Sequence, residues 1–290
     1  MNILWYNTWS LPFITSNSYI NKLTDYILEN VVKYDIDIIA LCEVFDYYTR
    51  KNYIYLIKNA LQDWEVINNG NIKRWNFQVS SGILIFYRDQ YLDVLNIKNH
   101  ILNNASMVDV LAAKSMIGIY IYDKQLKKKQ WICFTHLQNS NASGKNYCLS
   151  NTLKQFNECI LTINKWNIYN DSILCIGDFN LEPNFLPKSL LQKNDLYCLH
   201  TNTSTTNDNK IYDYIICSAY NSNKFELLLV DDKKNISDHR LLIIQTKLKN
   251  IKDKKKIKLN QYKNLPDNTK FYISFILLII FIYQYMNIKK

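Results

Sequence analysis

Apolar runs that each lead into one polar side chain recur along this chain, and no other feature constrains its fold as strongly. The polar side chains at or beside the ends of these runs are Asn7, Glu43, His136, Asp178 and the pair Asp238-His239. A buried strand that ends in a carboxylate, amide or imidazole presents that group at the edge of a sheet, where α/β enzymes usually place their chemistry. Five such runs in one chain predict a shared active site rather than separate solvated loops.

The segments between these runs show the periodicity of a layered α/β domain. Apolar residues recur at helical spacing in residues 19–34, 53–61 and 149–166, and β-branched or aromatic runs occupy 82–87, 117–122 and 212–217. The chain has 290 residues, 48% of them hydrophobic, which is enough to bury a large core in one domain. Because strands and helices alternate without a glycine-rich phosphate loop, we expect an α/β catalytic domain over residues 1–246.

The cysteines and the N-terminus indicate the compartment. The chain has seven cysteines, an odd number, and four of them lie inside apolar runs. This usage is typical of small core residues in a reducing compartment, and not of a disulfide framework. The N-terminus has no basic stretch followed by a long apolar region, so no signal peptide is expected.

The net charge of +10 is concentrated in the C-terminal tail. Residues 247–290 contain eleven lysines and two aspartates, a net of +9, which leaves +1 for residues 1–246. A nucleic-acid-binding surface normally carries its lysines and arginines on the domain that contacts the phosphates. The charge balance therefore disfavours a nucleic-acid partner.

The tail divides into a lysine-rich linker, residues 247–270, and an uncharged stretch, residues 271–288. As a helix, these 18 residues would be ~27 Å long, enough to cross a bilayer if the flanking lysines reach the interface. The lysines of the linker place the catalytic domain on the cytoplasmic side. We therefore expect a transmembrane tail anchor whose linker is attracted to anionic lipid. A buried or interfacial helix of a soluble protein is the alternative for this stretch.

Taken together, the polar residues resemble the motifs of the endonuclease/exonuclease/phosphatase superfamily. In chain order over nearly all of 1–246, the matching residues are Asn7, Glu43, His136, Asp178 and Asn180 of a Gly-Asp-Phe-Asn string, Asp213, and Asp238-His239. The superfamily implies a four-layer sandwich of two mixed β-sheets flanked by helices, and Mg²⁺-dependent cleavage of phosphate esters. A carboxylate at a strand end suits Mg²⁺, which prefers few protein oxygens and several waters.

Four local strings resemble neutral sphingomyelinases within this superfamily. They are Glu43-Val44-Phe45-Asp46, Thr135-His136-Leu137-Gln138, Asn7-Thr8-Trp9-Ser10-Leu11-Pro12, and Asp109 and Lys114 spaced as an Asp-x₄-Lys pair. The strings typical of abasic-site nucleases and of inositol-polyphosphate phosphatases are absent. Cys42 and Ser115 replace a Gln and a Gly that are common in the family, but neither position supplies a metal ligand or the base. The resemblance implies hydrolysis of sphingomyelin to ceramide and phosphocholine.

The resemblance also implies the metal site and the general base. Glu43 would bind Mg²⁺ with Asn7 nearby. His239 would activate water, since an imidazole with a pKa near ~6.5 is mostly neutral at neutral pH. Either Asp213 or Asp238 would hold the ring of His239, and the other would reach the metal ion.

The remaining residues would act on the phosphate and on the leaving group. Asn180 and His136 would bind non-bridging phosphate oxygens as charge develops. Asp178 would protonate the leaving alkoxide, although a water molecule on the metal ion is an equally good donor that Asp178 could orient. Asp109 and Lys114 would lie near the site.

Three alternatives to sphingomyelin hydrolysis remain open from the sequence. A nuclease could use the same scaffold, and a phospholipase C-like activity on lyso-phosphocholine lipids would use the same chemistry. A catalytically silent, membrane-tethered adaptor is disfavoured because every expected catalytic residue type is present.

Overall fold

Two six-stranded sheets form the centre of the computed structural model, which describes residues 1–11, 15–70, 79–105, 111–140, 146–230, 236–247 and 256–266. The first sheet has the order β11 (Phe225–Val230), β12 (Leu241–Thr246), β1 (Asn2–Asn7), β2 (Ile38–Cys42), β4 (Leu84–Arg88) and β3 (Trp64–Asn68). The second has the order β5 (Leu92–Ile101), β6 (Ser115–Asp123), β7 (Lys128–His136), β8 (Ser172–Asp178), β10 (Asp213–Ser218) and β9 (Leu196–Leu199). The pairs β1–β2 and β7–β8 are parallel and the other neighbouring pairs are antiparallel, so both sheets are mixed.

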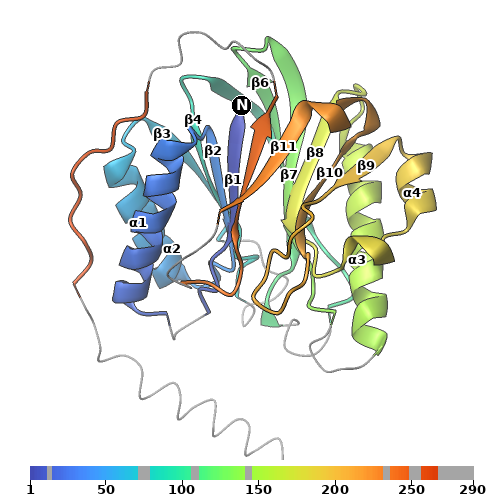
Figure 1. Cartoon of the computed structure of the whole chain (residues 1–290), viewed down its shortest axis with the longest axis horizontal. Coiled ribbons are helices and arrows are strands. Elements are labelled where there is room, and N and C mark those ends of the chain that lie inside the picture. Colours follow the sequence, from blue (N-terminus) through green and yellow to red (C-terminus); the bar gives the residue numbers. More distant parts are fainter. Residues whose placement is uncertain are drawn as a thin grey trace, which may run out of the picture.

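Helices cover the outer face of each sheet (Figure 1). The helices α1 (Asn17–Lys33) and α2 (Tyr47–Ala60) pack on the first sheet. The helices α3 (Asn146–Trp166) and α4 (Lys188–Lys193) pack on the second. The order of helix, sheet, sheet and helix confirms the predicted α/β sandwich.

The alternation of side chains along the central strands produces these layers. In β1, Ile3 and Trp5 lie in the core between the two sheets, whereas Leu4 and Tyr6 pack beneath α1 and α2. Because both faces of such a strand are buried, its sequence is a continuous apolar run. The seven cysteines are all free, and six of them are buried, in strands or in α3.

The second helix begins well before its apolar periodicity indicates. The sequence predicts a helix from residue 53, but α2 begins at residue 47 because Asp46 caps it. The Asp46 carboxylate accepts hydrogen bonds from the backbone N–H of Thr49 at 2.9 Å and from its hydroxyl at 2.7 Å. An N-cap of this kind satisfies backbone donors that have no partner within the helix.

Four strands were not predicted, namely β3, β5, β9 and β11. β5 is ten residues long, yet most of its side chains are half-buried or exposed, and its register shifts between Val94 and Asn96. A strand with so little buried surface and an irregular register has no clear alternation in its sequence.

Residues 256–266, which we call the strap, lie along α1 and α2 (Figure 1). They belong to the segment that the sequence indicates as a linker. Ile257, Tyr262 and Leu265 are partly buried against the core beneath the two helices. The predicted membrane segment, residues 271–288, lies outside the described residues. Among the residues that are described, no helix is long and apolar enough to cross a bilayer.

Candidate active site

The polar strand ends meet at one edge of the sandwich. Asn7 ends β1 and Glu43 follows the neighbouring parallel strand β2, while His136 and Asp178 end the parallel strands β7 and β8. Asp213 begins β10 directly opposite Asp178. A cavity of about 270 Å³ opens at this edge, lined by Trp9, Leu11, Glu43, Lys114, His136, Asn139, Asp178, Asn180, Asp238 and His239.

Glu43, which lines this cavity, is held in a left-handed backbone conformation, with φ of 61°. Its Oε1 atom lies 3.5 Å from Nε2 of His136. Its Oε2 atom is buried and has no hydrogen-bond partner among the described residues. Burial raises the pKa of the Glu43 carboxyl, although the positive charge of Lys114 lowers it. A buried carboxylate oxygen with no donor is a good ligand for a divalent cation, so the residues at this position fit a metal site.

Arg50 of α2 holds the loop that carries Glu43, a role that the sequence did not indicate. Its guanidinium donates hydrogen bonds of 2.8 Å to the backbone oxygens of Val44 and Ile83 and to the hydroxyl of Ser80. Burial lowers the pKa of Arg50 to about 10. An arginine in an amphipathic helix is usually solvated, so its residue type does not indicate a buried contact. The one signal in the sequence is its position, one turn after the Asp46 cap and close to Glu43.

Asn7 and Asp178 link the two sheets across the site. The amide Nδ2 of Asn7 donates to Oδ2 of Asp178 at 2.9 Å, and the backbone N–H of Asn180 donates to Oδ1 at 3.0 Å. The pKa of the Asp178 carboxyl is raised to about 7: burial raises it most, the carboxylates of Asp213 and Glu43 also raise it, and the charge of His239 lowers it. This carboxyl group can therefore hold a proton near neutral pH.

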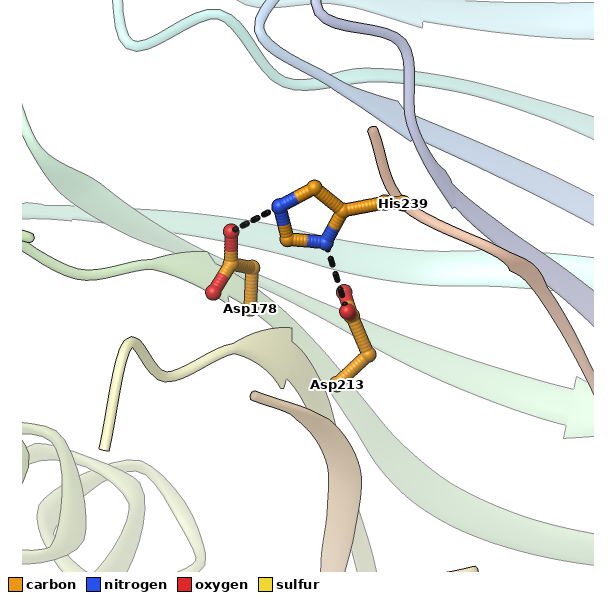
Figure 2. Close-up of side chains that lie close together, drawn as sticks. All are labelled: Asp178, Asp213 and His239. Carbon is orange, nitrogen blue, oxygen red and sulfur yellow. Dashed lines mark hydrogen bonds and ion pairs between the residues drawn. The ribbon is translucent and has the colours of Figure 1, made fainter. Parts of the chain in front are cut away.

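Asp213 holds the ring of His239 (Figure 2). Nδ1 of His239 lies 2.7 Å from Oδ2 of Asp213, and the indole N–H of Trp5 donates to Oδ1 of the same carboxylate at 2.8 Å. Trp5 was not anticipated as a site residue because it lies inside an apolar run. Nε2 of His239 points toward Asp178, 3.7 Å from its Oδ2. Of the two aspartates that the sequence left open, Asp213 contacts the ring.

The protonation of His239 differs from the sequence expectation. Burial lowers the pKa of its imidazole, but the carboxylates of Asp213 and Asp178 raise it, and the net pKa is well above the ordinary value. In the metal-free protein the carboxylates therefore favour the charged form of this ring, whereas the sequence expectation used the ordinary pKa of an imidazole.

Asp178, Asp213 and His239 could also hold a metal ion themselves, since each offers a ligand atom and these atoms lie within 4.8 Å of one another. However, both oxygens of Asp213 already accept hydrogen bonds, from Trp5 and His239. The described residues offer two candidate places for a cation, namely this cluster and the Glu43 carboxylate, whose Oε2 atom has no hydrogen-bond partner among them.

His136 and Lys114 also line the cavity. The ammonium Nζ of Lys114 lies 3.1 Å from Nε2 of His136. Burial and the positive charges of Lys114 and His239 hold the pKa of His136 well below its usual value, so this ring is neutral. Asp109, predicted as the partner of Lys114 in the motif, lies outside the described residues.

Asn180 and Asp238 also line the cavity. The backbone of Asn180 is left-handed, with φ of 49°, and its amide donates to the backbone oxygen of Leu137 at 3.1 Å. Asp238 lies next to His239, and the hydroxyl of Ser237 anchors this turn by donating to the backbone oxygen of Asn7 at 2.8 Å. The structure therefore brings every described residue of the predicted site to one edge, with Asp213 behind His239.

Asp178 should make the stability of the metal-free protein fall as pH rises. Its pKa is raised from 3.8 to about 7 on folding, so the folded state binds this proton more tightly than the unfolded chain between those values. Between pH 5 and pH 8 the free energy of unfolding should fall in the wild type. In Asp178→Asn this fall should be smaller by roughly 2–3 kcal/mol. Urea unfolding in a chelator measures this.

The matched control for this prediction is Asp93→Asn. Asp93 forms an exposed ion pair with Lys124 at 2.8 Å, and its removal should leave the pH profile unchanged. An equally steep profile in Asp178→Asn and in the wild type would show that the Asp178 carboxyl keeps an ordinary pKa.

A model of the Endonuclease/Exonuclease/phosphatase family matches residues 4–239 of the chain. No curated protein sequence matches this chain. Several solved structures are similar at low sequence identity. A double mutant of beta toxin from Staphylococcus aureus with bound magnesium ions is 16% identical, with a TM-score of 0.66, covering 85% of this chain and 99% of that one.

Two further solved structures, named for different activities, resemble this chain with similar TM-scores. Sphingomyelinase C from Streptomyces griseocarneus is 14% identical, with a TM-score of 0.61 and coverage of 84% of this chain and 98% of that one. A mannosyl-6-phosphatase from Bacteroides thetaiotaomicron is 16% identical, with a TM-score of 0.59 and the same coverage. At these identities the similarity shows a shared fold and leaves the substrate open.

Proposed function

The chain belongs to the endonuclease/exonuclease/phosphatase family, and we propose that it is a membrane-anchored, Mg²⁺-dependent phosphodiesterase that hydrolyses sphingomyelin to ceramide and phosphocholine. Members of this family are generally hydrolytic phosphoesterases. The observation that carries the proposal is that Glu43, whose Oε2 atom has no hydrogen-bond partner among the described residues, and His239, held by Asp213, line the same cavity.

A divalent cation would be held by Glu43, with Asn7 and Asp238 as further oxygen ligands, and it would supply positive charge to the phosphate and to the carboxylates. That charge would also offset the carboxylates that raise the pKa of His239. The neutral imidazole could then act as general base.

The reaction that we propose is the attack of water on phosphorus. His239 takes a proton from the water molecule at Nε2, while Asp213 holds Nδ1 and stabilises the imidazolium that forms. The bond between phosphorus and the ceramide oxygen breaks, and the leaving alkoxide takes a proton. We assign this proton to Asp178, whose pKa in the metal-free protein is raised to about 7, chiefly by burial, or to a water molecule that Asp178 orients.

Donors around the cavity would stabilise the charge on the phosphate. The Lys114 ammonium supplies a positive charge beside the neutral ring of His136, and both side chains are buried. The amide of Asn180 lies on the same cavity. Because these groups are preorganised in a poorly solvated site, they would act on the transition state without reorganisation.

The preference for a lipid substrate is supported by the tail and by the sphingomyelinase-like strings. The tail sequence would insert residues 271–288 into a bilayer with the catalytic domain on the cytoplasmic side. A tethered enzyme meets a membrane lipid at a high effective concentration. The net charge of residues 1–246 is close to zero, so this domain would attract nucleic-acid phosphates only weakly, which disfavours a nuclease.

The substrate class is tested by comparing three substrates with the full-length chain. We expect Mg²⁺-dependent formation of ceramide and phosphocholine, without diacylglycerol, from vesicles of phosphatidylcholine and sphingomyelin, and no cleavage of duplex DNA with an abasic site. Lyso-phosphatidylcholine micelles test the related phospholipase C activity. Cleavage of the DNA with intact sphingomyelin would replace our proposal by the nuclease alternative, and inactivity on all three would favour a silent adaptor.

A further inference from the structure

The strap runs from the far end of the sandwich to the end that carries the cleft. The backbone N–H of Asn260 donates to the oxygen of Ala60, the last residue of α2, at 3.0 Å. Further along, the hydroxyl of Tyr262 donates to Asp25 in the middle of α1. The strap therefore travels toward the start of α1.

At the cleft end, two asparagines of α1 hold the strap by its backbone. Asn21 donates to the oxygen of Leu265 at 2.9 Å and accepts from its N–H at 3.0 Å. The buried amide of Asn17 donates to the oxygen of Pro266 at 2.7 Å. This helix start is tied to the cleft, because the hydroxyl of Tyr19 donates to the backbone oxygen of Thr8, one residue after Asn7.

We infer that the strap orients the catalytic domain on the bilayer, with the mouth of the cleft facing the lipid surface; the inference rests on the membrane anchor of the proposed function. The uncharged stretch begins at residue 271, five residues after Pro266. Five extended residues span at most ~17 Å, whereas an undocked linker of 24 residues could span ~80 Å. Docking of the strap thus shortens the free segment between the catalytic domain and residues 271–288, and this segment begins at the cleft end.

The cleft end carries exposed aromatic side chains that can contact lipid; the opposite end carries them too, so the orientation is set by the strap and not by these side chains. Trp9 lines the cavity and is 48% exposed, and Tyr47, at the start of α2, is 79% exposed. Phe185, in the segment that follows β8, is 56% exposed. Aromatic side chains of this kind are favoured at the interface between lipid and water.

Two tyrosines provide a matched pair of positions for measuring the orientation. Tyr47 lies at the cleft end, and Tyr169, which is 71% exposed, lies at the opposite end between α3 and β8. A fluorophore would be placed at position 47 or at position 169 of the full-length chain, through an encoded azide. The protein would be reconstituted into vesicles of phosphatidylcholine, phosphatidylserine and sphingomyelin that contain a nitroxide lipid. We expect several-fold stronger quenching at position 47 than at position 169.

Two leucines of the strap allow the same substitution at a docked and at an exposed position. Leu265 is partly buried against the helices, whereas Leu259 is 41% exposed. Leu265→Asp should release the strap, remove the difference in quenching between the two positions, and lower sphingomyelin hydrolysis in vesicles several-fold. Hydrolysis of a water-soluble phosphodiester should not change. Leu259→Asp should behave like the wild type in every assay.

Each outcome decides a separate point. Equal quenching at positions 47 and 169 in the wild type, or an unchanged difference in Leu265→Asp, would overturn the orientation. Failure of the full-length chain to float with the vesicles would overturn the anchor and the orientation together. Strong quenching at position 47 without hydrolysis of sphingomyelin would leave the orientation standing and reject the proposed substrate.

Discussion

Replacement of His239 by alanine is expected to lower phosphodiester hydrolysis by about 10²–10⁴-fold, the range for loss of a general base. The imidazole lines the cavity, and its Nδ1 atom is held by Asp213 at 2.7 Å. No other described side chain is both oriented by a buried carboxylate in this way and open to the cavity. Water attack on phosphorus would therefore proceed without a base in this variant.

The loss in His239→Ala must be separated from a loss of folding. Removing the imidazole leaves the buried Asp213 carboxylate with only the indole N–H of Trp5 at 2.8 Å, which is expected to cost stability. His239→Gln keeps an amide donor for Asp213 and provides a second variant. Activity on sphingomyelin vesicles is measured beside thermal unfolding for both. His200→Ala is the control, since that histidine is exposed. Full activity in a folded His239→Ala protein would reject the assignment of the base.

The second large effect is expected from Glu43→Gln. Loss of this carboxylate should raise the Mg²⁺ concentration needed for half-maximal activity by about 100-fold or more, because even the loss of a partner outside the ligand shell costs about 10–100-fold in metal affinity. In a chelator, the variant should be at least as stable as the wild type. The substitution removes a buried charge whose Oε2 atom has no donor.

Stability and activity together test the metal assignment. Mg²⁺ at 100 times its dissociation constant should stabilise the wild type by about 2.7 kcal/mol and Glu43→Gln hardly at all. Glu182→Gln is the control, because Glu182 forms a partly exposed ion pair with Lys210 at 2.8 Å. A Glu43→Gln protein that Mg²⁺ stabilises as much as the wild type would place the metal ion elsewhere, for example on Asp178 and its neighbours.

The convergence of the site could be predicted from the sequence because strand ends are conspicuous in an α/β fold. Asn7 and Asp178 each follow an unbroken apolar run, and parallel neighbours such as β1 with β2 and β7 with β8 bring such ends to one edge. The two-sheet architecture could be expected only from the resemblance. Strands such as β5, at the edge of the second sheet, alternate too weakly to be recognised in the sequence.

Other parts of the site depend on contacts that no local pattern carries. Arg50 and Trp5 act through hydrogen bonds to residues that are distant in the chain or hidden in the core. The raised pKa of His239 depends on carboxylates from two other strands. The strap could not be predicted because its apolar residues, Ile257, Leu259, Tyr262 and Leu265, do not recur at helical or strand spacing. Its position is set largely by side-chain amides of α1 that bind its backbone.

Hydrolysis of sphingomyelin vesicles by the full-length chain in heavy-oxygen water tests the central claim most directly. With Mg²⁺ present, attack of water on phosphorus should place the heavy isotope in phosphocholine and leave ceramide unlabelled, and EDTA should stop the reaction. Label in the ceramide hydroxyl group, or the same turnover in EDTA, would contradict the account.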